Sequence, residues 1–573
     1  MFNFSLKVLF LILFSTSLHA ETIPTVDDLN KELPQLPQQQ EEQTLIEPKT
    51  DIEQVNQNQL LKILVTDFLF DGNIKYSSEE LKKSIENFIS QELNYDDLLN
   101  VTNIISNYYR TRGFLATAYL PEQNINEGII IIKIVEGKLG KIIIDTGSSE
   151  INLSKKRIKR FINNKLEKES VLNISQLDKN IRQINSLYGI NAVAELQEGE
   201  NFGETDIKIQ IFNTPMFSGS TITNNHGSRS SGTGRLSNSI NIDGLFNLGE
   251  RFIFSSTMTG DVLNEDQYEK SNYYALSAIF PLGYNGLELT FRTSKMEYKL
   301  SDPFDSTKPS GYSTEYNFTL TKKLIETFTF NLNSSLSLSR NDYVNDLNTG
   351  NNSDKDTTKA LLNVGFDKTD NAFGGGVNFG SISFSLGEVD LTDNQTSFET
   401  DQTTTDTNGR NLKSNLILNR LQNLNQKTNL LIKFNGQYSA DNLDGSDQFS
   451  LGGVSGVRAY PSSEASGDLG FVTNLELKRN FDKFEGTLFY DYGKIKLHKH
   501  LYENWNATNP KLKNNYILRG WGFALDATIF KDINFNATYA FTIGNNSGSD
   551  TETKDVDGLT KGNRAYFSLT KNY

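Results

Sequence analysis

Arg458 and Asp491 are the two residues whose types and surroundings best suit a functional contact. Arg458 lies within a glycine-rich stretch that predicts a long loop, in the string Gly456-Val457-Arg458-Ala459-Tyr460. Asp491 is a single carboxylate on an aromatic strand, in the string Phe489-Tyr490-Asp491-Tyr492-Gly493. The planar guanidinium of arginine binds a carboxylate through two parallel hydrogen bonds and does not lose its proton in proteins. We therefore expect Arg458, at the loop tip, to fold back and pair with Asp491. The alternative is an arginine in a surface loop that contacts nothing.

Other residue types that commonly form catalytic or metal sites give no coherent pattern. His498 and His500 flank Lys499 with the spacing of ligands on one face of a strand, but no third ligand is nearby, so we interpret them as exposed loop histidines. The acidic stretch Asn352–Thr357 lacks the spacing and the terminal glutamate of an EF-hand loop. The sequence contains no G-x-S-x-G, Walker or H-E-x-x-H motif and no cysteine. It therefore predicts no enzyme, no cofactor and no metal site.

The composition indicates the kind of scaffold that must hold these residues. The 573 residues include 37 Phe and 23 Tyr, yet only 36% are hydrophobic. Transmembrane β-barrels combine polarity with many aromatic rings, because each strand needs one apolar face and rings collect at both membrane interfaces. The net charge of -14 argues against a nucleic-acid partner, since phosphate binding requires clustered Lys and Arg.

Residues 214–573 show the alternation that predicts barrel strands. Nearly every second residue is apolar in the segments 287–292, 328–338 and 430–438, and the residues between are largely Ser, Thr, Asn and Gln. A water-soluble sandwich would carry more charge on its outside, whereas uncharged polar residues suit a hydrated lumen. This part of the chain therefore predicts a transmembrane antiparallel β-barrel in contact with outer-membrane lipid.

Loop lengths and the last strand agree with a barrel. Residues 341–358 and 390–411 are acidic, rich in Asn and Thr, and predict long extracellular loops, whereas Pro281–Gly286 predicts a short periplasmic turn. The final segment, Ala565–Tyr573, ends on an aromatic residue. Outer-membrane barrels commonly end in this way for recognition by the barrel assembly machinery, which we expect as a partner during biogenesis.

The first 60 residues predict a leader and a linker. Residues 1–20 have an early lysine, a compact apolar core and a small residue at the end, as in a secretory signal peptide. Residues 21–60 are rich in Gln, Glu, Pro and Asp and predict a linker. Within it, Thr25–Leu33 has the alternative of forming one short helix.

Residues 61–137 and 138–213 repeat one order of elements: strand, helix, helix, strand, strand. The first copy predicts helices capped by Ser77 and Asn94, the second of which stops at Gly113, and strands at Ile63–Phe70, Phe114–Leu120 and Ile129–Val135. The second copy predicts helices that open at Ser154 and Ser175, and strands at Ile142–Asp145, Ile190–Leu196 and Thr205–Phe212.

The repeats and the Arg458 region together resemble the two-partner secretion transporters of the outer membrane, the TpsB-type family of ShlB, FhaC and HecB. The repeats are similar to POTRA domains, through the strings Tyr109–Phe114, Leu120–Gln123, Val135–Gly137 and Leu196–Gly199. The loop is similar to the VRGY/F motif of these translocators, and Phe489-x-Asp491-x-Gly493 to their F-x-D-x-G strand motif. One departure is Ala459, which stands where the family usually has glycine. The resemblance implies α+β periplasmic POTRA domains followed by a barrel of about 16 strands.

The resemblance also implies roles for individual residues. Gly456, Val457, Arg458, Ala459 and Tyr460 would form a gating loop, with Phe489, Asp491 and Gly493 as its partners on the barrel wall. We expect a substrate edge on the first POTRA domain, formed by Leu115, Ala116, Thr117, Ala118 and Tyr119 beside a helix that carries Ile104 and Tyr108. An extended chain would add to this edge as a further strand.

The function that follows is secretion of an unfolded exoprotein through the outer membrane of a Gram-negative bacterium, with the POTRA domains in the periplasm. The resemblance implies a TpsA-like exoprotein, a β-helical adhesin or haemolysin. Two alternatives remain open. An insertase of the same superfamily would assemble other barrels, and would usually carry more POTRA copies. A passive porin would need only the barrel and would leave the repeats unexplained.

Overall fold

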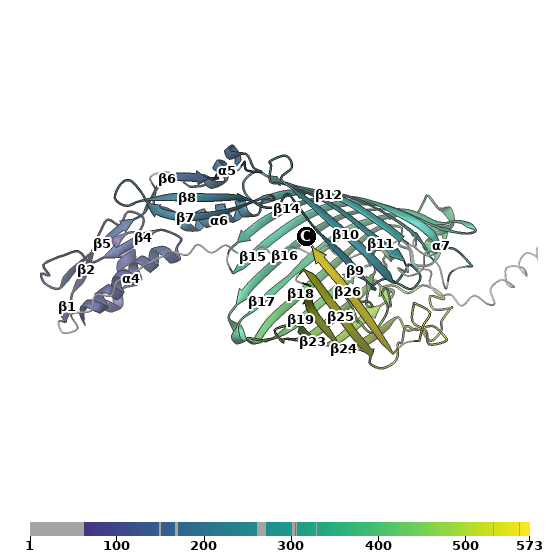
Figure 1. Cartoon of the computed structure of the whole chain (residues 1–573). Coiled ribbons are helices and arrows are strands. Elements are labelled where there is room, and N and C mark those ends of the chain that lie inside the picture. Colours follow the sequence, from purple (N-terminus) through teal and green to yellow (C-terminus); the bar gives the residue numbers. More distant parts are fainter. Residues whose placement is uncertain are drawn as a thin grey trace, which may run out of the picture.

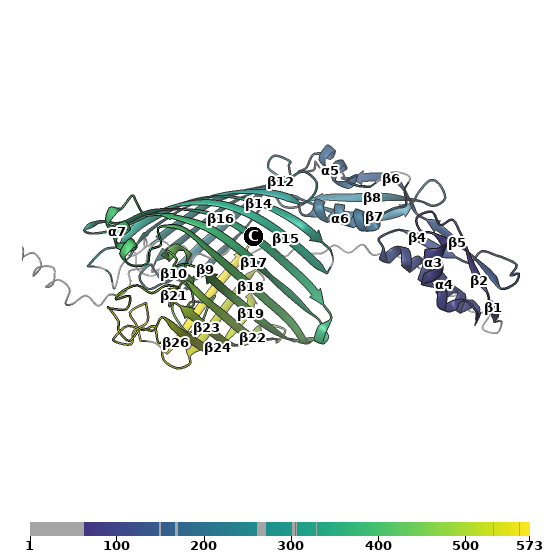
Figure 2. The ribbon, with the colours of Figure 1, turned by 180° about the vertical axis from the view of Figure 1, so that it is seen from behind.

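The computed structural model describes residues 62–147, 150–166, 170–260, 271–300, 304, 306–327, 329–530, 532–560 and 562–573. Two small α/β units lead one after the other to one end of a large closed barrel (Figure 1), and the reverse view shows the same order (Figure 2). We call the barrel end beside these units the proximal end and the opposite one the distal end. The predicted signal peptide (1–20) and the helix at Thr25–Leu33 lie outside the described residues, as does the predicted linker up to residue 60.

The first unit packs helices against a three-stranded sheet. Its elements are β1 (Ile63–Val65), β2 (Asp67–Asp71), α3 (Ser78–Ser84), β3 (Gln91–Leu93), α4 (Tyr95–Thr111), β4 (Ala116–Tyr119) and β5 (Ile129–Glu136). β5 is central, parallel to β2 and antiparallel to β4. The predicted caps are confirmed, because Ser77 and Asn94 each form a capping box with the acidic residue three positions later.

The single strand predicted at Ile63–Phe70 is wrong, because the chain changes partner inside it. β1 pairs with β3, whereas β2 pairs with β5. Between them, Thr66 donates its backbone N–H to the carbonyl of Gly128 and its hydroxyl to that of Glu127. Thr66 and Asp67 interrupt the apolar run at this point, and this polar pair is the signal that the prediction of one strand overlooked.

The second unit repeats this arrangement. Its elements are β6 (Lys138–Asp145), α5 (Lys155–Ile162), α6 (Ile174–Asn185), β7 (Ile190–Glu198) and β8 (Glu204–Asn213), with β8 central, parallel to β6 and antiparallel to β7. The predicted opening of the second helix at Ser175 is wrong. Asn173 caps it instead, and its side chain accepts a hydrogen bond from the N–H of Gln176 at 2.9 Å. None of the helices in the described residues is long and apolar enough to span a membrane.

Sixteen antiparallel strands close the barrel in the described part of the chain, which confirms the number that the family resemblance implied. They are β9 (Phe217–Asn224), β10 (Gly234–Asp243), β11 (Arg251–Gly260), β12 (Ser271–Leu282), β13 (Leu287–Lys299), β14 (Ser310–Glu326), β15 (Phe330–Leu347), β16 (Gly350–Asp370), β17 (Gly376–Asp390), β18 (Gly409–Asn425), β19 (Thr428–Ser439), β22 (Leu469–Asn480), β23 (Glu485–Lys496), β24 (Asn515–Ile529), β25 (Ile533–Thr542) and β26 (Asn563–Asn572). β26 closes the ring by pairing with β9.

The alternation along the strands separates an apolar outside from a polar lumen. On β14, Phe318 and Leu320 are exposed on the outside, while Thr319 between them shares a hydrogen bond of 2.7 Å with Ser337 of β15. Asn415 and Gln437 form a similar bond between β18 and β19, at 2.9 Å. This is the distribution that lipid outside and water inside require.

One of the two predicted long loops is not a loop. β15 and β16 continue through residues 341–358 and pair as far as Leu347 and Gly350. Cross-strand polar contacts hold this extension, such as the one between Arg340 and Asp356 at 2.6 Å. The other prediction, 390–411, is confirmed as a connection that contains only α7 (Gln395–Thr403) between β17 and β18.

Candidate functional site

A long connection between β19 and β22, residues 440–468, packs against the inner face of the barrel wall. We call it the inward loop. Its short strands β20 (Phe449–Ser450) and β21 (Ser466–Gly467) pair with each other and make a narrow neck, beyond which the tip carries Arg458. Its apolar side chains, among them Leu451, Val457 and Tyr460, form one buried cluster with wall residues of β22 to β25. The loop is therefore docked through a small core of its own.

Arg458 and Asp491 lie in direct contact at the loop tip. The guanidinium donates from Nε to Oδ2 of Asp491 at 2.9 Å and from Nη2 to Oδ1 at 2.7 Å, and the backbone N–H of Arg458 donates to Oδ2 at 3.0 Å. Asp491 is 0% exposed and Arg458 is 8% exposed. Each charge would be left without compensation if the other were removed, so the contact holds the tip firmly against β23.

Two further residues on β22 complete the contact. Glu476 Oε1 lies 3.0 Å from Nη1 of Arg458 and also binds Nζ of Lys433 at 2.9 Å. Asn474 donates to Asp491 Oδ1 at 2.7 Å and to the carbonyl of Gly456 at 3.0 Å. We did not assign roles to Asn474 and Glu476 from the sequence. The sequence does contain an indication of their position. Asn474 and Glu476 are two residues apart in the alternating run 472–477, so both lie on the strand face that points into the lumen.

The other predicted wall residues shape the surface beneath the loop. The Phe489 ring lies under the Arg458 guanidinium at 3.5 Å, a cation–π contact. Gly493 leaves room for the tip, because a Cβ added there would lie 2.9 Å from Cγ2 of Val457. Tyr460 is buried, and its carbonyl accepts a hydrogen bond from the hydroxyl of Tyr566 on β26 at 3.2 Å. All predicted loop and wall residues thus meet in one place.

The base of the inward loop is tied to a different part of the wall. Asp447 Oδ1 binds Nζ of Lys359 on β16 at 2.8 Å and Nζ of Lys413 on β18 at 2.7 Å. Asp444 binds Nζ of Lys355 at 2.8 Å. These ion pairs were not predicted, since the partners are far apart in sequence and single charges on strands carry no signal of pairing.

A third attachment joins the loop to the connection between β25 and β26. Glu464, 2% exposed, accepts hydrogen bonds from the Asn546 side chain at 2.6 Å and the Val556 N–H at 2.8 Å. Glu464 lies outside the barrel strands. Burial, together with the neighbouring charge of Asp555, raises the pKa of Glu464 to about 7. This attachment is therefore sensitive to pH near neutrality.

The predicted substrate edge lies where expected in the first unit, but part of it is already occupied. β4 is the edge strand of its sheet. The backbone N–H of Ala118 donates to Ser106 Oγ of α4 at 2.9 Å, and the N–H of Leu115 donates to the carbonyl of Leu172 in the second unit at 3.1 Å. Thr117 and Tyr119 are exposed. A strand added at this edge would have to displace Ser106.

The neighbouring Tyr109 and Glu136 explain why two of the POTRA-like strings occur together. Glu136 is buried, and its Oε1 accepts hydrogen bonds from the Tyr109 hydroxyl at 2.8 Å and from the N–H groups of Ile74 and Lys75 at 2.9 and 2.8 Å. Burial and this carboxylate raise the pKa of Tyr109 above its ordinary value. The pair fixes the turn after β2 against α4.

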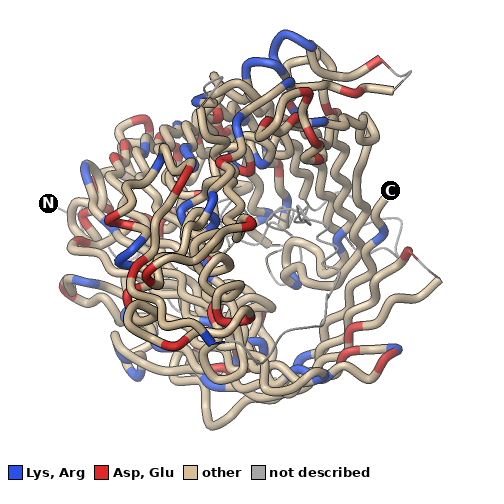
Figure 3. The backbone as a smooth tube through the Cα atoms, turned by 90° about the vertical axis from the view of Figure 1, so that its left-hand side faces the viewer, with Lys and Arg blue, Asp and Glu red and all other residues tan. Residues whose placement is uncertain are grey.

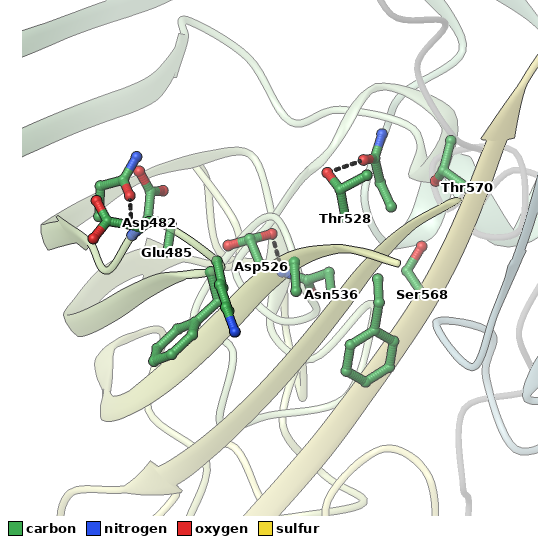
Figure 4. Close-up of a pocket in the computed structure, with 13 residues that line it drawn as sticks. Asp482, Glu485, Asp526, Thr528, Asn536, Ser568 and Thr570 are labelled. Atoms are coloured by element: carbon green, nitrogen blue, oxygen red, sulfur yellow. Dashed lines mark hydrogen bonds between the residues drawn. The ribbon is translucent and has the colours of Figure 1, made fainter. Parts of the chain in front are cut away.

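A hollow of about 420 Å³ lies at the proximal end of β23 to β26, away from the Arg458 contact (Figure 4). Its labelled side chains include Asp526 and Asn536, joined by a hydrogen bond of 2.7 Å, and Ser568 and Thr570 on the last strand. The lining is largely polar and carries more acidic than basic side chains.

His498 and His500 lie in the connection between β23 and β24. The His498 ring packs edge-on against Tyr502 and Trp505, and His500 Nε2 lies 3.1 Å from the carbonyl of Ala440. Within the described residues, no group of three or more His, Cys, Asp or Glu side chains has the arrangement of a metal site.

Comparisons with known proteins agree with this arrangement. The family model of the haemolysin secretion/activation protein ShlB/FhaC/HecB matches residues 203–508, and the model of the ShlB-type POTRA domain matches residues 63–137. The heme/hemopexin transporter protein HuxB of Haemophilus influenzae is 27% identical over 548 residues, which cover 93% of this chain and 94% of HuxB.

Solved structures show the same fold. CdiB from Escherichia coli superposes with a TM-score of 0.69 at 18% identity, over 92% of this chain and 93% of that chain. BamA from Haemophilus ducreyi lacking POTRA domains 1–3 gives a TM-score of 0.52 at 14% identity, over 89% of this chain and 100% of that chain. The fold is thus common to the transporter CdiB and to BamA over most of this chain, whereas the sequence model that matches is that of the secretion proteins.

Proposed function

This chain belongs to the haemolysin secretion/activation protein family ShlB/FhaC/HecB, and we propose from that premise how its parts divide the work of secretion. It is an outer-membrane β-barrel transporter of two-partner secretion whose POTRA region lies in the periplasm. The proximal end of the barrel therefore faces the periplasm and the distal end faces the outside. The family match favours secretion over the insertase alternative.

The second α/β unit is a second POTRA domain in this proposal. Its support is the repeated arrangement of a central last strand, parallel to the first strand and antiparallel to the intervening one. The two units form a path that leads the exoprotein from the periplasm to the barrel. We propose the β4 edge, with Ala116 to Tyr119, as the place where an extended segment first adds.

The inward loop is the gate of the barrel in this proposal. The single observation that carries it is the buried Arg458–Asp491 contact, which holds the loop tip on β23 with charge-assisted hydrogen bonds. Three separate attachments hold the loop: Arg458 binds β23, Asp447 binds lysines of β16 and β18, and Glu464 binds the connection between β25 and β26. Release of these contacts would free space along the lumen.

The chain acts without an enzymatic step of its own in this proposal. The driving force for passage would come from the exoprotein folding outside the cell, which withdraws the chain from the channel. We propose a β-helical adhesin or haemolysin as the class of exoprotein, because such a fold can form progressively as the chain emerges.

Quantitative proteomics of culture supernatant and outer membranes tests this function. Cells with the wild-type protein, without it, and with Arg458→Ala should differ in one large secreted protein while other barrels stay at the same level. A broad fall in outer-membrane barrels would instead indicate an insertase. Unchanged supernatant and membranes would contradict a role in secretion.

A further inference from the structure

Helix α5 carries a dense group of positive charges, although the whole chain has a net charge of -14. Five of its eight residues are Lys or Arg, in the sequence KKRIKRFI. Ile158, Phe161 and Ile162 are buried in the second unit, whereas Lys155, Lys156 and Lys159 are exposed. We call these three lysines the basic face. In the described part of the chain, no acidic residue forms an ion pair with any of them.

The position of α5 against the barrel is fixed by its remaining polar and aromatic side chains. Arg157 Nη2 donates to the carbonyl of Pro281 at 2.7 Å, and Arg160 Nη1 donates to the hydroxyl of Tyr284 at 3.1 Å. The Tyr284 ring also packs edge-on against Phe161 at 4.9 Å. The helix therefore lies directly beside the periplasmic turn between β12 and β13.

This turn lies at the level of the membrane surface. Leu282, next to Pro281, is exposed, and Phe252 packs against Phe246 and Phe280 with ring centroids 5.8 Å apart in both pairs. Rings gathered at one end of barrel strands are typical of the band that contacts lipid headgroups. The basic face is held beside this band by the contacts of Arg157 and Arg160.

The helix also lies on the outer side of the barrel rim. Both ribbon views place α5 at the upper edge of the second unit, above β7, β8 and α6 (Figures 1 and 2). Rotation about the vertical axis keeps it at the top in Figure 3, where Lys and Arg gather above the ring of strands. The helix therefore lies on the periplasmic side of the lipid that surrounds the barrel and away from the lumen.

We propose that the basic face of α5 binds anionic phospholipid headgroups in the periplasmic leaflet of the outer membrane. Each Lys or Arg close to an anionic membrane surface is attracted by the negative charge of the headgroups and strengthens such binding. The partner follows from charge complementarity and from the place of the helix beside the lipid-facing ends of β11 and β12. Binding would keep the second unit pressed on the rim, so that the path for the exoprotein ends at the opening.

The absence of cysteine allows a direct test on the full chain. A single Asn163→Cys substitution, at the exposed end of α5, takes an environment-sensitive fluorophore. The labelled protein is placed in lipid nanodiscs of neutral phosphatidylcholine, with or without about 30% phosphatidylglycerol, and quenching by headgroup spin-labelled lipid is measured.

The expected result is about twofold stronger quenching in the anionic discs, which is lost on raising the salt concentration to about 0.5 M. The variant with Lys155, Lys156 and Lys159 changed to Gln should lose this increase. A matched variant with Lys62, Lys83 and Lys138 changed to Gln loses equal charge on the POTRA region and should keep it.

Equal quenching in neutral and anionic discs would overturn the proposal. So would an undiminished increase in the α5 variant, or preferential charge-dependent binding of soluble polyglutamate at α5 when anionic discs are present. That last outcome would assign the basic face to an acidic protein segment.

Discussion

Gly520 on β24 and Ala459 in the inward loop are in such close contact that a Cβ added to Gly520 would lie 2.8 Å from that of Ala459. Real Cβ atoms essentially never approach so closely, so a side chain at position 520 must displace the loop. Ala459 is also the residue at which this chain departs from the glycine usual in the family. The methyl group of Ala459 thus occupies the space that is left because Gly520 has no side chain.

The first prediction follows from this fit. Gly520→Ala should weaken docking of the inward loop by about 1–3 kcal/mol, because overpacking costs this much in a close-packed site. The variant should show more frequent channel opening in planar bilayers. Combining it with Ala459→Gly should restore closure, because the second change removes the Cβ at position 459 against which the new Cβ at position 520 is crowded. Failure of the double variant to close would mean that the two residues do not act through their contact.

The second prediction concerns the Arg458–Asp491 pair. Arg458→Ala and Asp491→Ala should each impair secretion, and the double variant should be little worse than either, because each single change leaves one buried charge without its partner. Arg458→Lys keeps the charge but cannot bind bidentately, so it should restore only part of the activity. Immunoblots of culture supernatants measure secretion by the two single variants and the double variant, and these values together form a double-mutant cycle. Additive losses would contradict a direct functional pair.

The third prediction is a dependence of loop docking on pH. The pKa of Glu464 is about 7 when the loop is docked, above its ordinary value of 4.5, because the side chain is buried near Asp555 and Asp557. Arg564 pairs with both of these aspartates, and the Tyr516 hydroxyl also lies close to the carboxylate. The docked state therefore holds the Glu464 proton more tightly than the undocked state.

The sign of the effect follows from linkage. Docking is favoured at about pH 4.5 and below, weakens as the pH rises from there to about 7, and changes little above that. Channel opening should increase over this range, and Glu464→Gln should remove the dependence because it keeps the size of the side chain but cannot ionise. Opening that increases as the pH falls would contradict this account.

The fourth prediction concerns the first POTRA domain. Tyr109→Phe should lower its local stability by roughly 1–3 kcal/mol, because the buried Glu136 loses one of its donors. Hydrogen exchange of the full chain should show faster exchange in α4 and β5 and unchanged exchange in the second unit. Tyr108→Phe serves as the control, since Tyr108 forms no hydrogen bond with Glu136 in the described structure. Equal effects of both changes on hydrogen exchange would contradict the claim that the Tyr109–Glu136 hydrogen bond stabilises this domain.

The sequence predicted those features that are encoded over short distances. Ser77 and Asn94 were found as caps because each forms its capping box within three residues. Arg458 and Asp491 were found together because each lies in a distinctive string. The alternating strands predicted the barrel, because one face must meet lipid and the other water.

What the sequence did not predict depends on contacts between distant segments. Asp447 binds two lysines on other strands, and no local pattern distinguishes them from solvated charges. The occupied N–H of Ala118 depends on how α4 packs against β4. The extension of β15 and β16 has loop-like composition, so only cross-strand pairing could reveal it.

The most direct test of the gate is a reversible lock between the loop tip and the wall. Val457→Cys with Gly493→Cys should form a disulfide, because a Cβ on Gly493 would lie 2.9 Å from Cγ2 of Val457 and the chain has no other cysteine. Leu477→Cys with Leu488→Cys joins two neighbouring wall strands, β22 and β23, on their exposed outer face away from the loop, and serves as the control. We predict that the first variant secretes nothing until a reductant is added, while the control secretes with or without it. Normal secretion by the oxidised loop-to-wall variant would contradict the account, because the loop would then not need to leave β23.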